Sequence, residues 1–337
     1  MPMRSRVVEP VPGRPALIRP GELLTSAPGA VARWALSADP IEDLHLVRLS
    51  PGVDVLDLTA DLRAQGHAAS PNHVFVGQPL LWGGPGGVPA PAEAVPYEPG
   101  EPGDVTVAVL DTGLAPHPWL RRWYAGETAE VADADGDGRL DEQAGHGTFV
   151  AGLIVRAAPG VRLRPVRFLD SHGVGDEAAL LRALARLRSE RVGILNLSFG
   201  GFTFDDLPPI GLAEALAAFP AVVACAGNTA SSRPFWPAAL AGVVAVAGLD
   251  GQVRAPFSAY GPWVDACAQS VDLTSCFLDR GGFHGYATWS GTSFAAAAVS
   301  GALARLCRGM PPGAAVARLL HEGRQIPDLG VVVGVDG

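Results

Sequence analysis

A serine near the C-terminal end of the chain stands where its hydroxyl could do chemistry. Ser293 follows Gly291-Thr292 and leads directly into the small apolar residues 294–298. This pattern predicts a tight turn that feeds the first turn of a buried helix. Unsatisfied N–H groups at a helix N-terminus favour negative charge, so a serine oxygen there could act as a nucleophile beside a developing oxyanion. Serine is also an ordinary helix cap, and a nucleophile needs a base and an orienting acid from elsewhere.

An aspartate and a histidine occupy positions that suit those two roles. Asp111 directly follows the apolar residues 105–110, so its carboxylate lies at the carboxyl end of a predicted strand. It could orient a histidine there, or it could begin a turn. His146 lies between Gly145 and Gly147 at the predicted start of a helix. A helix N-terminus disfavours a permanently protonated ring and therefore suits a neutral general base, although a lone histidine is more often structural.

The three motifs, in this order along the chain, resemble those of the subtilisin-like serine peptidases, the subtilases. They are Asp111-Thr112-Gly113, Gly145-His146-Gly147-Thr148 and Gly291-Thr292-Ser293. The resemblance extends over about residues 104–306. It implies hydrolysis of peptide bonds through an acyl-enzyme, in which His146 deprotonates Ser293 and Asp111 holds the imidazole.

The resemblance also implies residues that bind the oxyanion and the substrate. Asn228 would donate its side-chain amide to the oxyanion together with the backbone N–H of Ser293. Residues 196–201 look like the segment that pairs with a substrate backbone as an added strand. The implied substrate-binding residues are Ser198, Phe199, Gly200, Ala226 and Gly227. The chain departs from the family pattern at residues 294–298, directly after the nucleophile.

Two functions of different classes fit these motifs. The first is an active serine endopeptidase, and the second is a catalytically silent subtilase-fold protein that only holds peptides. A complete set of Asp111, His146, Ser293 and Asn228 favours the enzyme, because a binding module has no need of the full acyl-transfer machinery.

An acidic stretch just before the histidine motif has the D-x-D-x-D-G spacing of calcium loops. The predicted ligands are Asp133, Asp135, Asp137, Asp141 and Glu142. The twelfth position of this loop is Ala144, which departs from an EF-hand. A solvated acidic loop is therefore an equal alternative to a structural calcium site, and the chemistry itself requires no cofactor.

The elements that must position these residues follow from the pattern after residue 104. Apolar strands alternate with alanine-rich helices, which predicts an α/β fold with a doubly wound, mainly parallel sheet and helices on both faces. Expected strands are residues 105–110, 162–168, 193–198, 221–226 and 243–247, and expected helices are 146–156, 177–190, 212–218 and 314–320. Active sites in such sheets form at the carboxyl ends of the strands.

The remainder of the chain divides by composition into four parts. We expect an irregular segment at 1–38, a small α/β domain at 39–78, a Pro/Gly-rich linker at 79–103 and the peptidase-like domain at 104–337. The small domain, with strands at 44–49 and 71–76, resembles a subtilase propeptide, which assists folding and inhibits by laying its tail in the cleft. The alternative is a permanent substrate-binding or packing domain.

Bulk composition limits the classes of function. The 337 residues are 48% hydrophobic, which is ample for one large core and a small appended domain. The net charge is −9 and every basic residue is arginine, which argues against nucleic-acid binding and leaves a peptide or protein substrate as the partner. No apolar run is long enough for a membrane span, and no signal-like segment is visible, so we expect a cytoplasmic protein, with secretion by an unrecognised route as the alternative. The four cysteines are expected to be free, or bridged at Cys267–Cys276 if the protein is exported.

Overall fold

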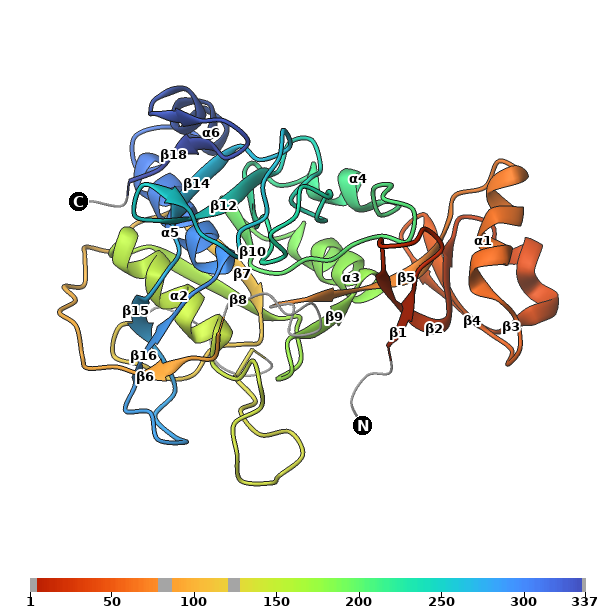
Figure 1. Ribbon diagram of the computed structural model, residues 1–337, viewed down its shortest axis with the longest axis horizontal. Helices are drawn as coiled ribbons and strands as arrows, with labels where there is room; N and C mark the ends of the chain where they lie inside the picture. The colour runs from red at the N-terminus through yellow and green to blue at the C-terminus, as the bar shows by residue number, and fades with distance from the viewer. Residues whose placement is uncertain (1–4, 78–86, 121–127, 335–337) are drawn as a thin grey trace.

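The computed structural model describes residues 5–77, 87–120 and 128–334. Figure 1 shows a large α/β unit and, at its side, a small unit built by the N-terminal part of the chain. Both units are built around sheets, and one strand of the small unit joins the two.

The large unit is built on a nine-stranded sheet with the order β17-β18-β14-β12-β11-β10-β7-β8, and β13 pairs with β12. The strands from β18 to β8 in this order are parallel. The bounds are β7 Thr106–Asp111, β8 Arg162–Arg167, β10 Ile194–Leu197, β11 Val222–Cys225, β12 Val244–Asp250, β13 Val253–Arg254, β14 Ala266–Gln269, β17 Gln325–Ile326 and β18 Gly330–Val332. This arrangement confirms the predicted mainly parallel sheet.

Helices cover both faces of this sheet. The first face carries α2 (His146–Ala157) and α5 (Thr292–Leu306), and the other carries α3 (Glu177–Leu187) and α4 (Leu212–Leu216). Along β7, Val107 and Val109 belong to the first core, while Ala108 and Leu110 belong to the second. A strand buried on both faces has no polar side, which explains its continuous apolar sequence.

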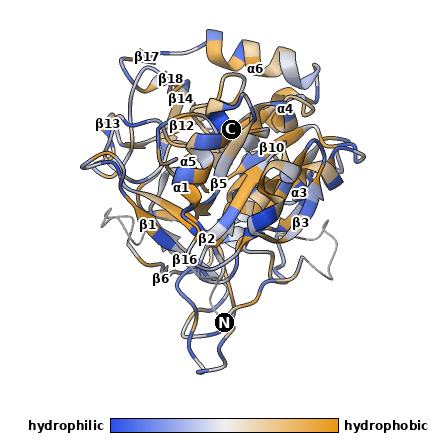
Figure 2. Cartoon of the chain, turned by 90° about the vertical axis from the view of Figure 1, so that its right-hand side faces the viewer, coloured by the Kyte–Doolittle hydropathy of each residue, from blue (hydrophilic) through white to orange (hydrophobic). Residues whose placement is uncertain are grey.

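The predicted strands and helices of the large unit are present, with ends shifted by a few residues. The amphipathic helix expected at 314–320 is α6 (Pro312–His321), which buries Ala315 and Leu319 and leaves polar residues outside. Figure 2 shows the mixed hydropathy of this helix at the edge of the molecule. The strands β14 and β18, which lie inside the sheet next to its edge strand β17, were not predicted, because they are short and give no clear pattern.

The small unit is an antiparallel sheet in the order β3-β4-β2-β5, with β1 paired to β2 and one helix packed on it. Its elements are β1 Arg6–Val8, β2 Ala16–Thr25, η1 Pro28–Trp34, β3 Ala35–Ile41, β4 Leu44–Leu49, α1 Val55–Ala64 and β5 Ala69–Val76. Asp54 caps α1, and its Oδ1 accepts hydrogen bonds from the N–H groups of Leu56 and Asp57.

The expectation of an irregular segment at residues 1–38 was wrong. About half of this segment belongs to the sheet of the small unit, and β2 is its longest strand. Pro20 and Gly21 look like turn residues, but they lie inside β2, where the pairing with β5 shifts register between Ile18 and Leu23. Gly21 has a φ of +67°, so an irregularity in the strand absorbs the proline and the glycine without ending it.

The last strand of the small unit crosses to the large unit. β5 pairs antiparallel with β9 (Val174–Asp176), so that β9 becomes the edge strand of the small unit's sheet. In Figure 1, β5 extends out of the small unit and lies beside β9. The chain then returns at β6 (Ala90–Pro91), which pairs with β16 (Tyr286–Trp289) in a third sheet that also holds β15 (Leu273–Cys276). The expected linker is therefore partly integrated into the large unit; its residues 79–86 lie outside the described ranges.

All four cysteines are free thiols, so the alternative Cys267–Cys276 bridge is not formed. Within the described part of the chain, no helix combines the length and the apolar character needed to cross a membrane.

Candidate active site

Asp111 and His146 form a buried pair at the carboxyl end of the parallel sheet. Asp111 ends β7, and His146 begins α2. The Nδ1 atom of His146 lies 2.8 Å from Oδ1 of Asp111, and both side chains are almost completely buried. The carboxylate oxygen also accepts the N–H of Thr112 at 2.8 Å. With Nδ1–H donating to the carboxylate, the lone pair of the neutral ring resides on Nε2.

A glycine allows α2 to lie this close to β7. A Cβ atom at Gly147 would clash with the carbonyl oxygen of Gly113 and would lie 3.1 Å from Cβ of Asp111. The glycine that follows the histidine is therefore required by the close packing of the two motifs.

Aromatic rings surround the imidazole. The ring centroid of Trp289 lies 5.5 Å from that of His146 in an edge-to-face arrangement, and the ring of Phe294 lies at 5.6 Å. Phe294 in turn packs at 4.4 Å against Phe149 on α2. Phe294, which departs from the family pattern directly after Ser293, thus packs against the histidine ring.

Ser293 lies in the first turn of α5, as the sequence predicts, but its hydroxyl is not hydrogen-bonded to His146. Its Oγ lies 3.1 Å from the carbonyl oxygen of Ser198 and 3.4 Å from that of Gly77. Among the described residues, Nε2 of His146 has no hydrogen-bond partner. The acid–base half of the expected triad is therefore assembled, and the serine is turned toward the chain segment that follows β5.

Asn228 lies beside the N-terminus of α5. Its Oδ1 accepts both the N–H and the hydroxyl of Thr292, at 2.9 and 2.8 Å. With Oδ1 occupied in this way, the NH₂ group is the end of the side chain that remains to donate. Asn228 is only 3% exposed, so that donor lies in a site largely shielded from water.

A chain of buried hydrogen bonds ties the end of β10 to α5. Ser300 donates to Oδ1 of Asn196 at 2.9 Å, Nδ2 of Asn196 donates to Oγ of Ser198 at 2.9 Å, and that hydroxyl donates to the carbonyl oxygen of Ser293 at 3.0 Å. Fully satisfied buried networks fix geometry, and this one sets the position of Ser293 relative to residues 198–200.

The predicted substrate-pairing segment already holds a strand. Gly200 exchanges two backbone hydrogen bonds with Val76, at 2.8 and 3.0 Å, and β9 pairs with the other edge of β5. Phe199 is buried, and its ring contacts those of Phe75 and Phe168. The N–H of Gly77 donates to the carbonyl oxygen of Gly173 at 2.8 Å. β5 thus lies between β9 and Gly200, and Gly77, the residue after β5, reaches Ser293.

The two predicted residues before Asn228, Ala226 and Gly227, are held by their backbone N–H groups. The N–H of Ala226 donates to the carbonyl oxygen of Val246, and that of Gly227 donates to Oγ1 of Thr292 at 3.1 Å. Gly227 has a φ of +96° and borders the ring of Phe235.

The half-buried Glu130, which the sequence did not single out, has a buried carboxylate oxygen and contacts the threonine next to Asp111. Oε2 of Glu130 lies 3.1 Å from the hydroxyl of Thr112 and 3.5 Å from that of Thr148. Burial raises the pKa of Glu130 to about 8, and the charge of Asp111 adds to the rise, while a hydrogen bond from the backbone of Gly145 lowers it. No local sequence motif marks this residue, because its burial comes from long-range packing.

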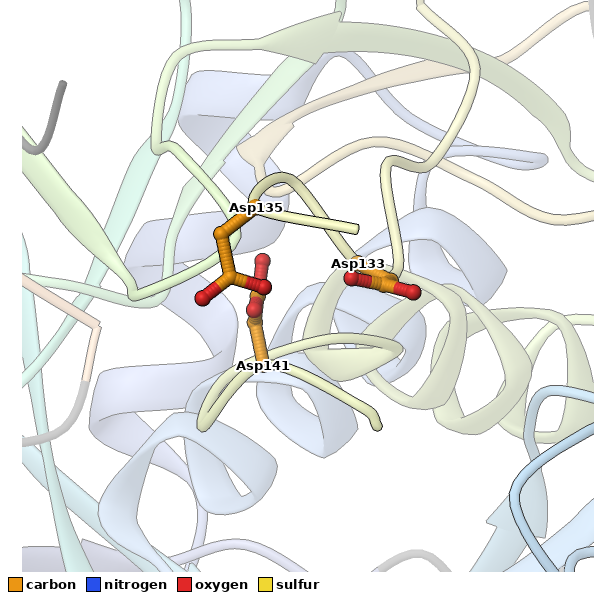
Figure 3. A group of neighbouring side chains, drawn as sticks. All are labelled: Asp133, Asp135 and Asp141. Carbon is orange, nitrogen blue, oxygen red and sulfur yellow. The ribbon is translucent and has the colours of Figure 1, made fainter. Parts of the chain in front are cut away.

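The acidic stretch gathers only some of its predicted ligands. One carboxylate oxygen from each of Asp133, Asp135 and Asp141 lies within 4.8 Å of the others. Figure 3 shows the three side chains gathered together. Asp137 lies outside this group and accepts the N–H of Arg139 at 2.8 Å. Glu142 instead forms an ion pair with His172, which lowers the pKa of the glutamate. The prediction of five neighbouring ligands was wrong for these two residues, whose side chains have closer partners.

An α/β sheet with a buried Asp–His pair and a serine at a helix N-terminus, in this chain order, defines the class of subtilisin-like serine peptidase folds. Residues 103–318 match the model of the subtilase family, and the chain belongs to that family.

Curated relatives agree with this assignment. The chain is 34% identical over 209 residues to a thermostable alkaline protease of Halalkalibacterium halodurans, a match that covers 59% of this chain and 55% of the relative. It is 34% identical over 213 residues to a thermophilic serine proteinase of Bacillus sp. strain AK1, covering 59% and 51%. It is 32% identical over 212 residues to subtilisin BL of Lederbergia lenta, covering 59% and 75%. The chain thus spans about half the length of the first two relatives.

Solved structures show the same fold. A cold-adapted subtilisin-like serine proteinase superposes with a TM-score of 0.56 at 26% identity, over 70% of this chain and 89% of that one. Fervidolysin of Fervidobacterium pennivorans, a keratinolytic enzyme related to subtilisin, superposes with a TM-score of 0.71 at 19% identity. The second match covers 97% of this chain and 61% of the other, so it includes the small unit, and at this identity it speaks for the fold alone.

Proposed function

We propose that this chain is a serine endopeptidase that cleaves peptide or protein substrates through an acyl-enzyme. The observation that carries the proposal is the buried Asp111–His146 pair, at 2.8 Å, whose imidazole packs on Phe294, the residue directly after Ser293 at the N-terminus of α5. The names of the relatives, which are proteases, agree with it.

The proposed reaction uses four side chains. His146 takes the proton of Ser293 through Nε2, the only ring nitrogen not committed to Asp111, once the serine turns away from the Ser198 carbonyl oxygen. The serine oxygen attacks the substrate carbonyl carbon, and the NH₂ of Asn228 and the N–H of Ser293 receive the oxyanion. His146 then protonates the leaving amine, and water hydrolyses the acyl-enzyme by the same steps in reverse order.

We further propose that the small unit, residues 5–77, inhibits the enzyme until it is cut away. The support is the position of β5, which occupies the strand place of a substrate between β9 and Gly200 and brings the carbonyl oxygen of Gly77 to 3.4 Å from the serine hydroxyl. Nε1 of Trp289, four residues before Ser293, donates to the carbonyl oxygen of Gly87 at 3.2 Å.

Polar contacts between the two units favour a specific docked complex. Arg19 pairs with Asp176 at 3.0 Å, and His73 pairs with Glu177 at 2.8 Å, with all four side chains largely buried. The N–H of Ala178 also donates to the side chain of Asn72, one residue before His73. Buried charges that lack partners are costly, so these pairs favour one docking geometry.

We also propose a structural calcium ion at the acidic loop. The three gathered carboxylates offer the hard oxygen ligands that calcium prefers. The loop is wrapped as such a site requires: Asp133 accepts the N–H groups of Gly136, Asp137 and Gly138, so its backbone curls around the carboxylates. The nearest described cation is Arg280, 3.7 Å from Asp133, which leaves most of the negative charge uncompensated.

A fluorophosphonate probe tests the central proposal. The full chain, incubated until its activity on a mixed peptide substrate is constant, should be labelled on Ser293, and the Ser293→Ala variant should not. If neither protein is labelled, even after the small unit has been removed, the chain is instead a silent peptide-binding member of the fold.

A further inference from the structure

An aromatic ring lies between the two backbone segments that flank the nucleophile. A Cβ atom added at Gly200 would clash with Cε1 of Phe235, and one added at Gly227 would lie 2.9 Å from its Cδ1. The same edge of the ring therefore touches both segments. Phe235 is only 2% exposed, so its ring fills this space.

The space that Phe235 fills is where a substrate side chain would have to enter. The carbonyl oxygen of Ser198 lies 3.1 Å from the Ser293 hydroxyl, and Gly200, two residues on, already pairs with the strand in the groove. Gly227 lies on the opposite side and precedes Asn228, the proposed oxyanion donor. Val74 and Val76 of β5 lie around the same small cavity as Phe235, whereas a Cβ atom at Gly77 would meet Leu169. Because side chains alternate along a strand, a substrate residue one position beyond Gly77 directs its side chain toward Phe235, and we place the carbonyl that Ser293 attacks on that residue.

The ring is held firmly in this place. Its neighbour Trp236 exchanges two backbone hydrogen bonds with Gly201, at 2.8 and 2.9 Å. Phe202 packs edge to face on Phe235, with ring centroids 5.5 Å apart. The guanidinium of Arg233 covers Phe202 at 4.1 Å and is itself anchored to Asp206 at 2.5 Å. Moving the ring out of the way would require these contacts to break.

We propose that Phe235 closes the deep part of the primary specificity pocket, so that the enzyme cleaves after small residues, namely glycine, alanine or serine. This inference rests on the proposed peptidase function and narrows its substrate class. A leucine or phenylalanine at the same place would overlap the Phe235 ring, and forcing extra atoms into a filled site is costly. A misfit of one or more carbon groups in such a pocket changes kcat/KM by about 10- to 200-fold.

The test compares peptides that differ only in the residue before the scissile bond. The full chain, brought to constant activity and titrated with a fluorophosphonate to count active sites, is assayed on substrates with alanine, leucine or phenylalanine at that position. We expect the alanine peptide to be cleaved at least about 30-fold more efficiently than the phenylalanine peptide. The Phe235→Ala variant should reverse this order, and the matched Phe235→Leu variant, which retains bulk, should keep a preference for alanine.

The outcomes separate this inference from the function on which it rests. Efficient cleavage after phenylalanine by the unaltered chain would overturn the inference and leave the peptidase function intact, and this result does not depend on whether any variant folds. An unchanged preference in a folded, fully titratable Phe235→Ala variant would also overturn it. Absence of both labelling and cleavage in the unaltered chain would overturn the inference together with the peptidase function.

Discussion

At the scale of single residues, the hydrogen bonds that a side chain already makes decide which of its donors and acceptors remain available. Oδ1 of Asp111 receives two donors, Nδ1 of His146 and the N–H of Thr112, and this fixes which imidazole nitrogen carries the proton. Likewise the two Thr292 donors orient the Asn228 amide. The threonine that orients Asp111 belongs to the same motif, whereas the threonine that orients Asn228 belongs to the Gly291-Thr292-Ser293 motif.

The Asp111→Asn variant should lose most activity without losing the fold. An asparagine keeps the shape of the carboxylate, but its NH₂ group can donate to Nδ1 and so place the imidazole proton on Nε2, where it blocks the base. We expect kcat/KM to fall by about 10⁴-fold, with an unchanged circular dichroism spectrum. Asp265→Asn is a matched control, because that carboxylate accepts the N–H of Ala245 away from the site and should leave kcat/KM unchanged.

If the two asparagine variants lost equal activity, the Asp111 carboxylate would have no special role. Steady-state assays of both proteins, normalised to active sites, decide this point.

Glu130 should make the protein less stable as the pH rises. Its folded pKa of about 8 lies above its ordinary value of 4.5, so the stability tied to its protonated form is complete below pH 4.5 and is lost as the pH rises to 8. The free energy of unfolding of the Ser293→Ala protein, measured with urea, should be lower at pH 9 than at pH 5. Adding Glu130→Gln should make this decrease smaller by more than about 1 kcal/mol.

Glu190→Gln provides the opposite case. Arg164 lowers the pKa of Glu190, so the stability from that pair is present above its ordinary pKa and is lost only toward acid. The Glu190→Gln substitution should therefore leave the change in the free energy of unfolding between pH 5 and pH 9 unaltered. If the free energy of unfolding changed equally with pH in Glu130→Gln and in the parent protein, the raised pKa of Glu130 would be contradicted.

The sequence predicted Asp111, His146, Ser293 and Asn228 because each lies in a short motif at the end of an element. It did not reveal Phe235, whose importance comes from two glycines that are 35 and 8 residues away in the chain. A phenylalanine at one position and a glycine at another are each compatible with many folds. The proposed role of Phe235 follows only from the three-dimensional structure, in which its ring lies against the two glycines.

At the scale of elements, the central strands and helices were predictable because they are long and apolar, whereas short or irregular elements were not. β2 was missed since a proline and a glycine interrupt it, and β5 was predicted as a strand without its partners. The pairing of β5 with β9 joins residues about 100 positions apart, and no local pattern encodes such a contact.

The acidic loop offers a prediction at this scale. Millimolar calcium should raise the melting temperature of the Ser293→Ala protein by several degrees, because a ligand that binds only the folded state stabilises it. Asp135→Asn should abolish the shift, since this carboxylate belongs to the gathered group. Asp137→Asn should retain it, because that side chain lies outside the group. Equal shifts in both variants, measured by scanning calorimetry, would show that the loop is not the binding site.

At the scale of the whole molecule, the two units are held by a continuous sheet and by buried ion pairs. The guanidinium of Arg19 reaches Asp176 across the boundary, and their side chains are 5% and 12% exposed. Asp176 also caps α3 through its other carboxylate oxygen, so the docking contact and the start of that helix share one residue.

Arg19→Leu should weaken inhibition by the small unit. Removing one partner of a buried pair leaves an uncompensated charge and costs about 3–5 kcal/mol. In this variant the cost destabilises the docked state of the small unit. The lag before peptidase activity appears in freshly folded protein should therefore shorten in this variant. Arg48→Leu is the control, because Arg48 lies on the same unit and is 59% exposed in its pair with Glu22. Equal lags in the two variants would argue against the docking role of Arg19.

If the proposed enzyme cuts its own chain between β5 and β6, the pairing of β6 with β16 affects what happens to the new ends. A break between Gly77 and Gly87 would leave both new ends tethered, one by β5 in the groove and the other by Gly87 and β6 on β16. Tethered groups meet at effective concentrations of the order of millimolar or more, so the freed amine could attack the acyl-enzyme and restore the bond. Cleavage between the small unit and the rest of the chain would then be reversible. The departure of the small unit, and not the cleavage itself, would make the separation permanent.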